Sequence, residues 1–136
     1  MRYFVELSYS GAAYNGWQRQ PNAPSIQQTI EERMSRLLGE TIEIVGAGRT
    51  DTGVNAEFYI AHFDTTREID NGADFCYHLN SMLPFDIAIK RIYPVSNDAH
   101  ARFDAISREY RYHIILGKDP FRKHVAWQYY GALDVE

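Results

Sequence analysis

The sequence predicts an α+β fold of the ferredoxin-like (split βαβ) type, in which helices pack on one face of a β-sheet. Two kinds of pattern carry this prediction. Several short segments alternate apolar and polar residues as strands do, and two longer segments repeat apolar residues at helical spacing. In chain order the segments read β-α-β-β-α-β-β, which is the split βαβ pattern with one added strand.

The first strand and the first helix carry the clearest patterns. The strand covers residues 2–9, where every second residue is apolar or aromatic: Tyr3, Val5, Leu7 and Tyr9. Residues 10–24 contain glycine, asparagine and proline without a period, which predicts a loop. A helix then follows Ser25, because Ser25 and Gln28 have capping-box spacing and Gly39 is a natural stop. Its apolar face is formed by Ile26, Ile30, Met34, Leu37 and Leu38.

The remaining elements are shorter. They are a strand over 41–46, a loop over 46–55, a strand over 56–64, a helix over 73–82, and strands over 86–93 and 107–116. In the second helix, Phe75, Leu79 and Met82 share one face, and Pro84 follows its end.

Composition and length are those of one globular domain. The 136 residues are 45% hydrophobic and 24% charged, which excludes a disordered or fibrous chain. No apolar run approaches the roughly 20 residues of a membrane helix, and the alternating N-terminus is unlike a signal peptide. We therefore expect a cytoplasmic protein without membrane contact. The single Cys76 excludes an intramolecular disulfide and a cysteine-based metal cluster.

The net charge of −4 by itself disfavours nucleic-acid binding. A local basic groove can nevertheless lie on an acidic protein, so bulk charge does not decide the partner.

The loop over 46–55 has the most unusual composition. Three glycines within eight residues indicate special backbone angles or the close approach of another segment. Arg49 and Asp51 are two residues apart, so they either pair with each other or face a common ligand. The simpler interpretation is a hairpin turn with two surface charges. No helix pattern follows GAG and no GK[ST] is present, which excludes a dinucleotide fingerprint and a Walker A loop.

Five segments in order resemble the tRNA pseudouridine synthase A family. They are YSGAAYNGWQRQ (9–20), GRTDTGV (48–54), LPFDIA (83–88), HARFDA (100–105) and SREYRY (107–112). The resemblance implies the fold of pseudouridine synthases and the isomerisation of uridine to pseudouridine in the anticodon stem-loop of tRNA. It also implies a homodimer that binds tRNA across both subunits. This chemistry has no redox step, so we expect no cofactor and no metal. The five histidines are scattered without a metal-ligand spacing such as HExxH.

The resemblance also assigns three catalytic residues. Asp51 is expected to be the catalytic nucleophile, and attack on the sugar, attack on the ring and action as a base all remain open. Arg49 is expected to favour the charged form of Asp51, to contact a phosphate or to fill the space left by a flipped nucleotide; the alternative is a surface ion pair. Tyr110 is expected to stack on the target uracil, and the alternative is a core tyrosine on a strand.

Further residues are candidates for RNA contact. Arg102 is expected to contact a phosphate or, alternatively, to form a structural ion pair, and His100 and Phe103 flank it with a packing or a binding role. Arg67 extends the basic groove or lies on a solvated face, as do Arg19, Arg108 and Arg111. Trp17 packs either beneath the active site or against a partner chain.

Two features depart from the family pattern. Asn55 stands where the family usually has histidine, although that histidine is not the nucleophile. Family members are also longer and have a second domain. We therefore expect residues 1–117 to form an N-terminal catalytic-type domain, with 118–136 leading toward a C-terminal domain absent from this chain.

Two other functions are compatible with parts of the sequence. A non-catalytic RNA-binding module on a ferredoxin-like scaffold explains the aromatic strand at 107–112, but such a module has no reason to keep the GRTD loop. A small-molecule enzyme that uses Asp51 and a histidine gains no support from the histidine spacing.

Overall fold

A computed structural model describes residues 1–105, 114–116 and 127–129, which fall into two compact units divided after Ala105. The first unit contains, in order, β1 (Arg2–Tyr9), α1 (Ile26–Leu38), β2 (Ile44–Gly46), β3 (Ala56–Asp64), α2 (Gly72–Met82) and β4 (Ile87–Val95). In the second unit, β5 (Ile114–Leu116) pairs in parallel with β6 (Trp127–Tyr129). No described helix is long and apolar enough to span a membrane.

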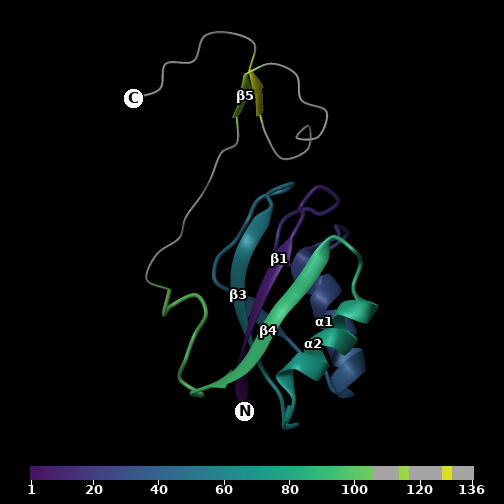
Figure 1. Cartoon of the computed structure of the whole chain (residues 1–136), viewed down its shortest axis with the longest axis vertical. Coiled ribbons are helices and arrows are strands. Elements are labelled where there is room, and N and C mark those ends of the chain that lie inside the picture. Colours follow the sequence, from purple (N-terminus) through teal and green to yellow (C-terminus); the bar gives the residue numbers. More distant parts are fainter. Residues whose placement is uncertain (106–113, 117–126, 130–136) are drawn as a thin grey trace. The chain divides into compact units, whose positions relative to one another are not determined.

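The first unit is built on a four-stranded antiparallel sheet with the order β2-β3-β1-β4 (Figure 1). The connection from β1 through α1 to β2 skips over β3, and the connection from β3 through α2 to β4 skips over β1. Each connection is therefore a split βαβ unit, and the predicted fold class is confirmed.

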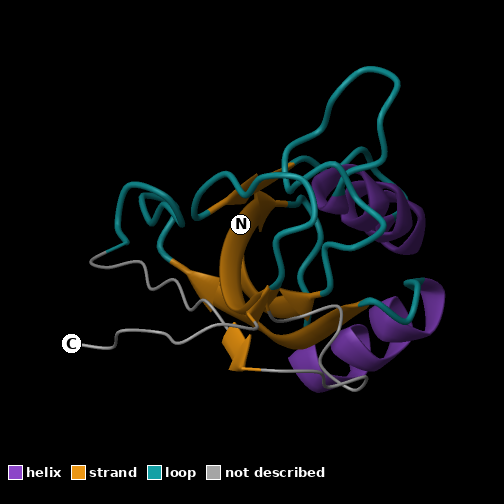
Figure 2. Ribbon diagram, turned by 90° about the horizontal axis from the view of Figure 1, so that it is seen from above, coloured by secondary structure: helices purple, strands orange, loops and turns teal. Residues whose placement is uncertain are grey.

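Both helices lie on the same side of this sheet (Figure 2). The four residues predicted to share the inner face of β1 are all buried, with Leu7 completely so. Neighbouring Phe63 on β3 and Ile30 and Met34 on α1 are also buried. Burial of these apolar side chains is the main stabilising contribution to the unit.

The first helix has the predicted caps. The backbone N–H of Gln28 donates to Ser25 Oγ at 3.1 Å, and Gly39 takes the left-handed conformation at φ +70°. Ser and Gly are the residues that these two positions favour.

Three element boundaries or faces differ from the predictions. The second strand pairs only over Ile44–Gly46, because the N–H of Ile42 donates instead to Ser35 Oγ at 2.9 Å. In α2 the buried residues are Cys76 and Leu79, whereas Phe75 and Met82 are only partly buried. Strand β4 extends to Val95, since its last two residues still pair with β1. Of the predicted strand over 107–116, only 114–116 lies within the described residues.

The face of the sheet opposite the helices is called the open face here; its residues include Phe4 and Glu6 of β1 and Ile60 and His62 of β3. Residues 96–105 contact one end of it, where Ala101 N–H donates to His62 Nδ1 at 3.0 Å and Arg2 Nη1 donates to the carbonyl of Ala99 at 2.7 Å. The open face is therefore partly covered by the chain itself.

Candidate functional site

The loop over 46–55 is a hairpin connection from β2 to β3, as the sequence predicts. The N–H of Ala47 donates to the carbonyl of Ile60 at 2.9 Å. The Tyr59 hydroxyl donates to the carbonyl of Gly48 and accepts from the N–H of Gly48 at 3.2 Å. The first half of the loop is thereby fixed to β3.

The part of this loop that carries Arg49 and Asp51 is held in place by the last residue of β1 and by the loop that follows β1. Thr50, which lies between them, hydrogen-bonds the Tyr9 hydroxyl through Oγ1 at 2.8 Å, and its carbonyl accepts from the N–H of Trp17 at 3.3 Å. Both the side chain and the backbone of this residue are therefore anchored.

Two more hydrogen bonds join the loop after β1 to the end of the Asp51 loop, next to β3. The N–H of Gly53 donates to the carbonyl of Tyr14 at 3.3 Å, and the N–H of Gly11 donates to Asn55 Oδ1 at 2.8 Å. Asn55, which departs from the family pattern, thus joins the two loops. Residues 10–17 are called the supporting loop from here on.

Two glycines of the supporting loop make this approach possible. A Cβ on Gly11 would lie 2.0 Å from the carbonyl oxygen of Val54, and one on Gly16 would lie 2.3 Å from that of Thr50. Gly16 also has φ +85°, a conformation that other residues adopt at a cost. No larger residue fits at either position without a shift of the backbone.

An aromatic cluster lies beneath the two loops. The ring centroids of Trp17 and Tyr59 are 4.5 Å apart, and the Tyr9 ring is 6.1 Å and 5.7 Å from them. Trp17 is only 3% exposed. Within the first unit Trp17 therefore packs beneath the candidate site, which was one of the two alternatives from the sequence.

The supporting loop is anchored in turn at the start of β4. Asp86 accepts from the Tyr14 hydroxyl at 2.8 Å, and its carbonyl accepts from the N–H of Ser10 at 2.9 Å. Burial, together with the hydrogen bond to Asp86, raises the pKa of Tyr14 to about 12, so its hydroxyl stays a donor. The segments 9–20, 48–54 and 83–88 thus form one connected structure.

Arg49 and Asp51 are both exposed on the anchored loop. Among the described residues, neither side chain has a hydrogen bond or ion pair, so the alternative of an Arg49–Asp51 pair is not what the structure shows. The carboxylate is accessible to a ligand while its backbone is fixed. Tyr110, the third predicted catalytic residue, lies outside the described residues.

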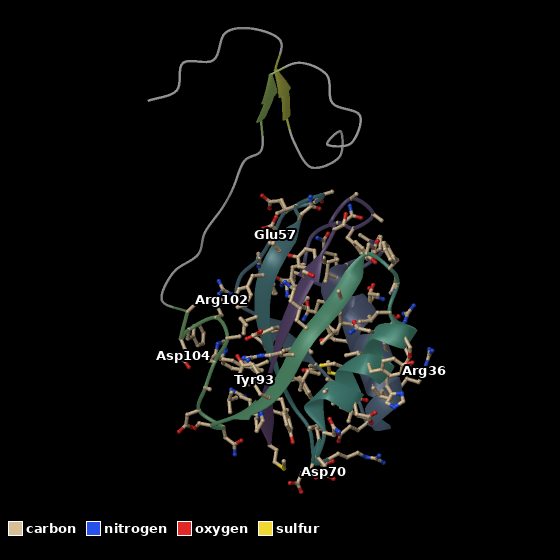
Figure 3. The ribbon with its side chains drawn as sticks, in the orientation of Figure 1. Arg36, Glu57, Asp70, Tyr93, Arg102 and Asp104 are labelled. Atoms are coloured by element: carbon tan, nitrogen blue, oxygen red, sulfur yellow. The ribbon has the colours of Figure 1, made fainter. Side chains whose placement is uncertain are left out.

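Residues 100–104 form a compact turn on the open face (Figure 3), called the HARF turn here. His100 N–H donates to Asp104 Oδ2 at 2.7 Å, and His100 Nδ1 accepts from the N–H groups of Arg102 and Phe103 at 3.2 and 3.1 Å. The rings of His100 and Phe103 stack at 4.0 Å, and Phe103 is 79% exposed. His100 therefore organises a turn that presents Arg102 and Phe103 at the surface.

Two other candidate arginines have different places in the first unit. Arg67 follows the end of β3, whereas the loop of Asp51 precedes its start, and nine strand residues extend over roughly 30 Å. The structure therefore does not bring Arg67 together with Asp51. Arg19 pairs through Nη2 with the buried Glu31 at 2.8 Å, which ties the segment after the supporting loop to α1.

Sequence reasoning missed three residues that support the loop, Tyr9, Tyr14 and Tyr59, and it noted Asn55 only as a departure from the family pattern. Tyr9 and Tyr59 lie in predicted strands, where an aromatic residue is ordinary and indicates no special role. The one available signal was the clustering of glycines and aromatic residues in segment 9–17.

The comparisons with known proteins agree with one another. A family profile described as tRNA pseudouridine synthase matches residues 7–104. A relative from Porphyromonas gingivalis named tRNA pseudouridine synthase A is 48% identical over 136 residues, which cover 99% of this chain and 54% of the relative. Relatives with the same name from Parabacteroides distasonis and Azobacteroides pseudotrichonymphae are 47% and 51% identical, over 99% and 89% of this chain and 54% and 48% of theirs. The chain thus spans about half the length of the curated relatives it matches.

Proposed function

The chain belongs to the tRNA pseudouridine synthase family, and we propose that it supplies the catalytic loop of an isomerase that converts uridine to pseudouridine in the anticodon stem-loop of tRNA. The observation that carries this proposal is the anchored loop: an exposed carboxylate, Asp51, next to a residue held by the Tyr9 hydroxyl and the Trp17 N–H. A surface turn has no need of such support. A nucleophile does, because the reacting groups must be held in a fixed geometry.

In this proposal the Asp51 carboxylate faces a uridine flipped out of the RNA. The bond from C1′ to N1 breaks, the uracil turns, and C1′ joins C5. The proton on C5 is released to solvent and N1 takes up a proton, so the composition of the nucleoside is unchanged. Flipping costs a few kcal/mol and less in an unpaired loop. Arg49 lies on the same exposed loop, where its guanidinium can contact a phosphate or fill the space that the nucleotide leaves. Tyr110 completes the set as the residue that stacks on the uracil.

The HARF turn supplies RNA contacts outside the reacting base. Arg102 is exposed and contacts a phosphate, and the exposed Phe103 ring, backed by His100, offers a stacking surface. Arg67, exposed beside Gly39 at the end of α1, is a separate candidate for phosphate contact. A homodimer in the cytoplasm, with tRNA bound across both subunits, is the assembly that fits this proposal.

The test measures tritium release from C5 of uridine in unmodified tRNA. Because the chain spans half of its relatives, the assay uses the chain itself and a chimera in which residues 1–136 replace the matching segment of the Porphyromonas gingivalis relative. We expect the chimera to release tritium and Asp51→Asn to abolish release. Asp70→Asn, which changes another exposed carboxylate, serves as the matched control. Undiminished release by Asp51→Asn would rule out the role of Asp51.

A second candidate function is a non-catalytic RNA-binding module. The exposed Phe103 and Arg102 on the open face favour it. It predicts that the chimera binds tRNA without releasing tritium, and that Asp51→Asn leaves function in cells unchanged.

A further inference from the structure

His62 is a buried polar residue that the proposed reaction does not use. It lies on β3, opposite Phe4 of β1, and is 3% exposed. Its Nδ1 accepts a hydrogen bond from the backbone N–H of Ala101, which is itself buried. A backbone N–H can only donate, so Nδ1 carries no proton and the neutral ring carries its proton on Nε2.

This hydrogen bond joins the HARF turn to the sheet. Ala101 is the residue immediately before Arg102, and the rest of the turn is closed by its own hydrogen bonds through His100 and Asp104. The ring of His100 also contacts His62 edge-on, with centroids 4.5 Å apart. Because the turn is internally closed, fixing Ala101 fixes the turn as a whole.

We propose that His62 is a positioning residue for RNA binding: its unprotonated Nδ1 holds Ala101 against the sheet and thereby sets the direction in which Arg102 and Phe103 meet the RNA. The inference rests on the proposed function, because it deepens the role given to the HARF turn. A rigidly held turn loses less conformational freedom on binding than a free one, which favours affinity.

The surroundings keep His62 in the required form. Burial is the main cause that lowers its pKa to about 4, and the nearby Arg2 and His100 act in the same direction. The negative charges of Asp64 and Asp104 raise the pKa of His62, but their effect is smaller. At neutral pH the ring is uncharged and Nδ1 is free to accept.

The test compares His62→Asn with His62→Leu in the chimera. The two replacements have nearly the same shape, and Asn Oδ1 lies where His Nδ1 was, so only Asn keeps the acceptor. We expect the dissociation constant for tRNA to rise about tenfold in His62→Leu and to stay within about twofold in His62→Asn, as the value of one hydrogen bond implies. Burying the apolar Leu side chain costs less than burying Asn. An effect of folding stability alone would therefore weaken His62→Asn more than His62→Leu, which is the opposite of the expected result.

Two further measurements make the result decisive. In a background that carries both Arg102→Ala and Phe103→Ala, the difference in affinity between the two His62 variants should shrink toward zero. Without RNA, amide hydrogen exchange at Ala101 should be slow in the wild type and in His62→Asn, and fast in His62→Leu. Equal affinities of both variants, with RNA bound normally by the wild type, would overturn this inference alone. Absence of RNA binding by the wild type would overturn the proposed function as well.

Discussion

The approach of the supporting loop to the loop of Asp51 can be tested by adding one methyl group. In Gly16→Ala the new Cβ would lie 2.3 Å from the carbonyl oxygen of Thr50, whereas real Cβ contacts essentially never fall below 3.0 Å. The two loops must therefore separate by at least about 0.7 Å. Alanine at φ +85° costs a further 1–2 kcal/mol or so. Because a displacement of about 1 Å can reduce turnover about 100-fold, we expect a loss of that order in tritium release.

Gly39→Ala is the matched control. Gly39 also has positive φ, at +70°, but a Cβ there would meet only the Arg67 guanidinium at 3.6 Å, an ordinary contact. Because alanine is strained in the left-handed conformation, we expect Gly39→Ala to lose about 1 kcal/mol of stability and to keep its activity. Thermal denaturation and tritium release are measured for both variants in the chimera. If Gly16→Ala releases tritium as fast as Gly39→Ala, the close packing of the two loops does not position Asp51.

The remaining predictions concern the buried polar groups. The pKa of His62 is about 4 in the folded chain and 6.5 ordinarily, so between these values the unfolded chain binds more protons. Stability is therefore retained above pH 6.5 and falls by about 2–3 kcal/mol as the pH drops toward 4. Urea denaturation between pH 4.5 and 7.5 should show this slope in the wild type and a smaller one in His62→Leu, and identical slopes would contradict it. Glu31 accepts from Arg19 and from the N–H of Ile44 at 2.8 Å. Glu31→Leu should lower the free energy of unfolding by about 3 kcal/mol, whereas exposed Glu32→Leu should change it by less than about 0.5 kcal/mol in the same denaturation assay.

The sequence predicted most of the fold because its signals are local. Alternation in residues 2–9 and the capping residues Ser25 and Gly39 act within a few positions of where they stand. The wrong details arose where a tertiary contact competes. The side chain of Ser35 in α1 accepts a hydrogen bond from the N–H of Ile42, and strand pairing begins only at Ile44.

The candidate site was predictable only in part. Arg49 and Asp51 stand out because their segment is rich in glycine, but their support comes from residues about 40 positions away. No periodicity connects Gly11 with Asn55 or Tyr9 with Thr50. Such contacts depend on the backbone paths of two loops, and only the structure reveals them.

The proposed isomerisation at the loop of Asp51 is tested most directly by identifying the product nucleoside. Unmodified tRNA is incubated with the chimera, digested to nucleosides and separated by chromatography. We predict that pseudouridine appears in the anticodon stem-loop at the expense of uridine, and that Asp51→Asn forms none. Tight binding of tRNA by the chimera without any pseudouridine would contradict it and would identify the chain as an RNA-binding module.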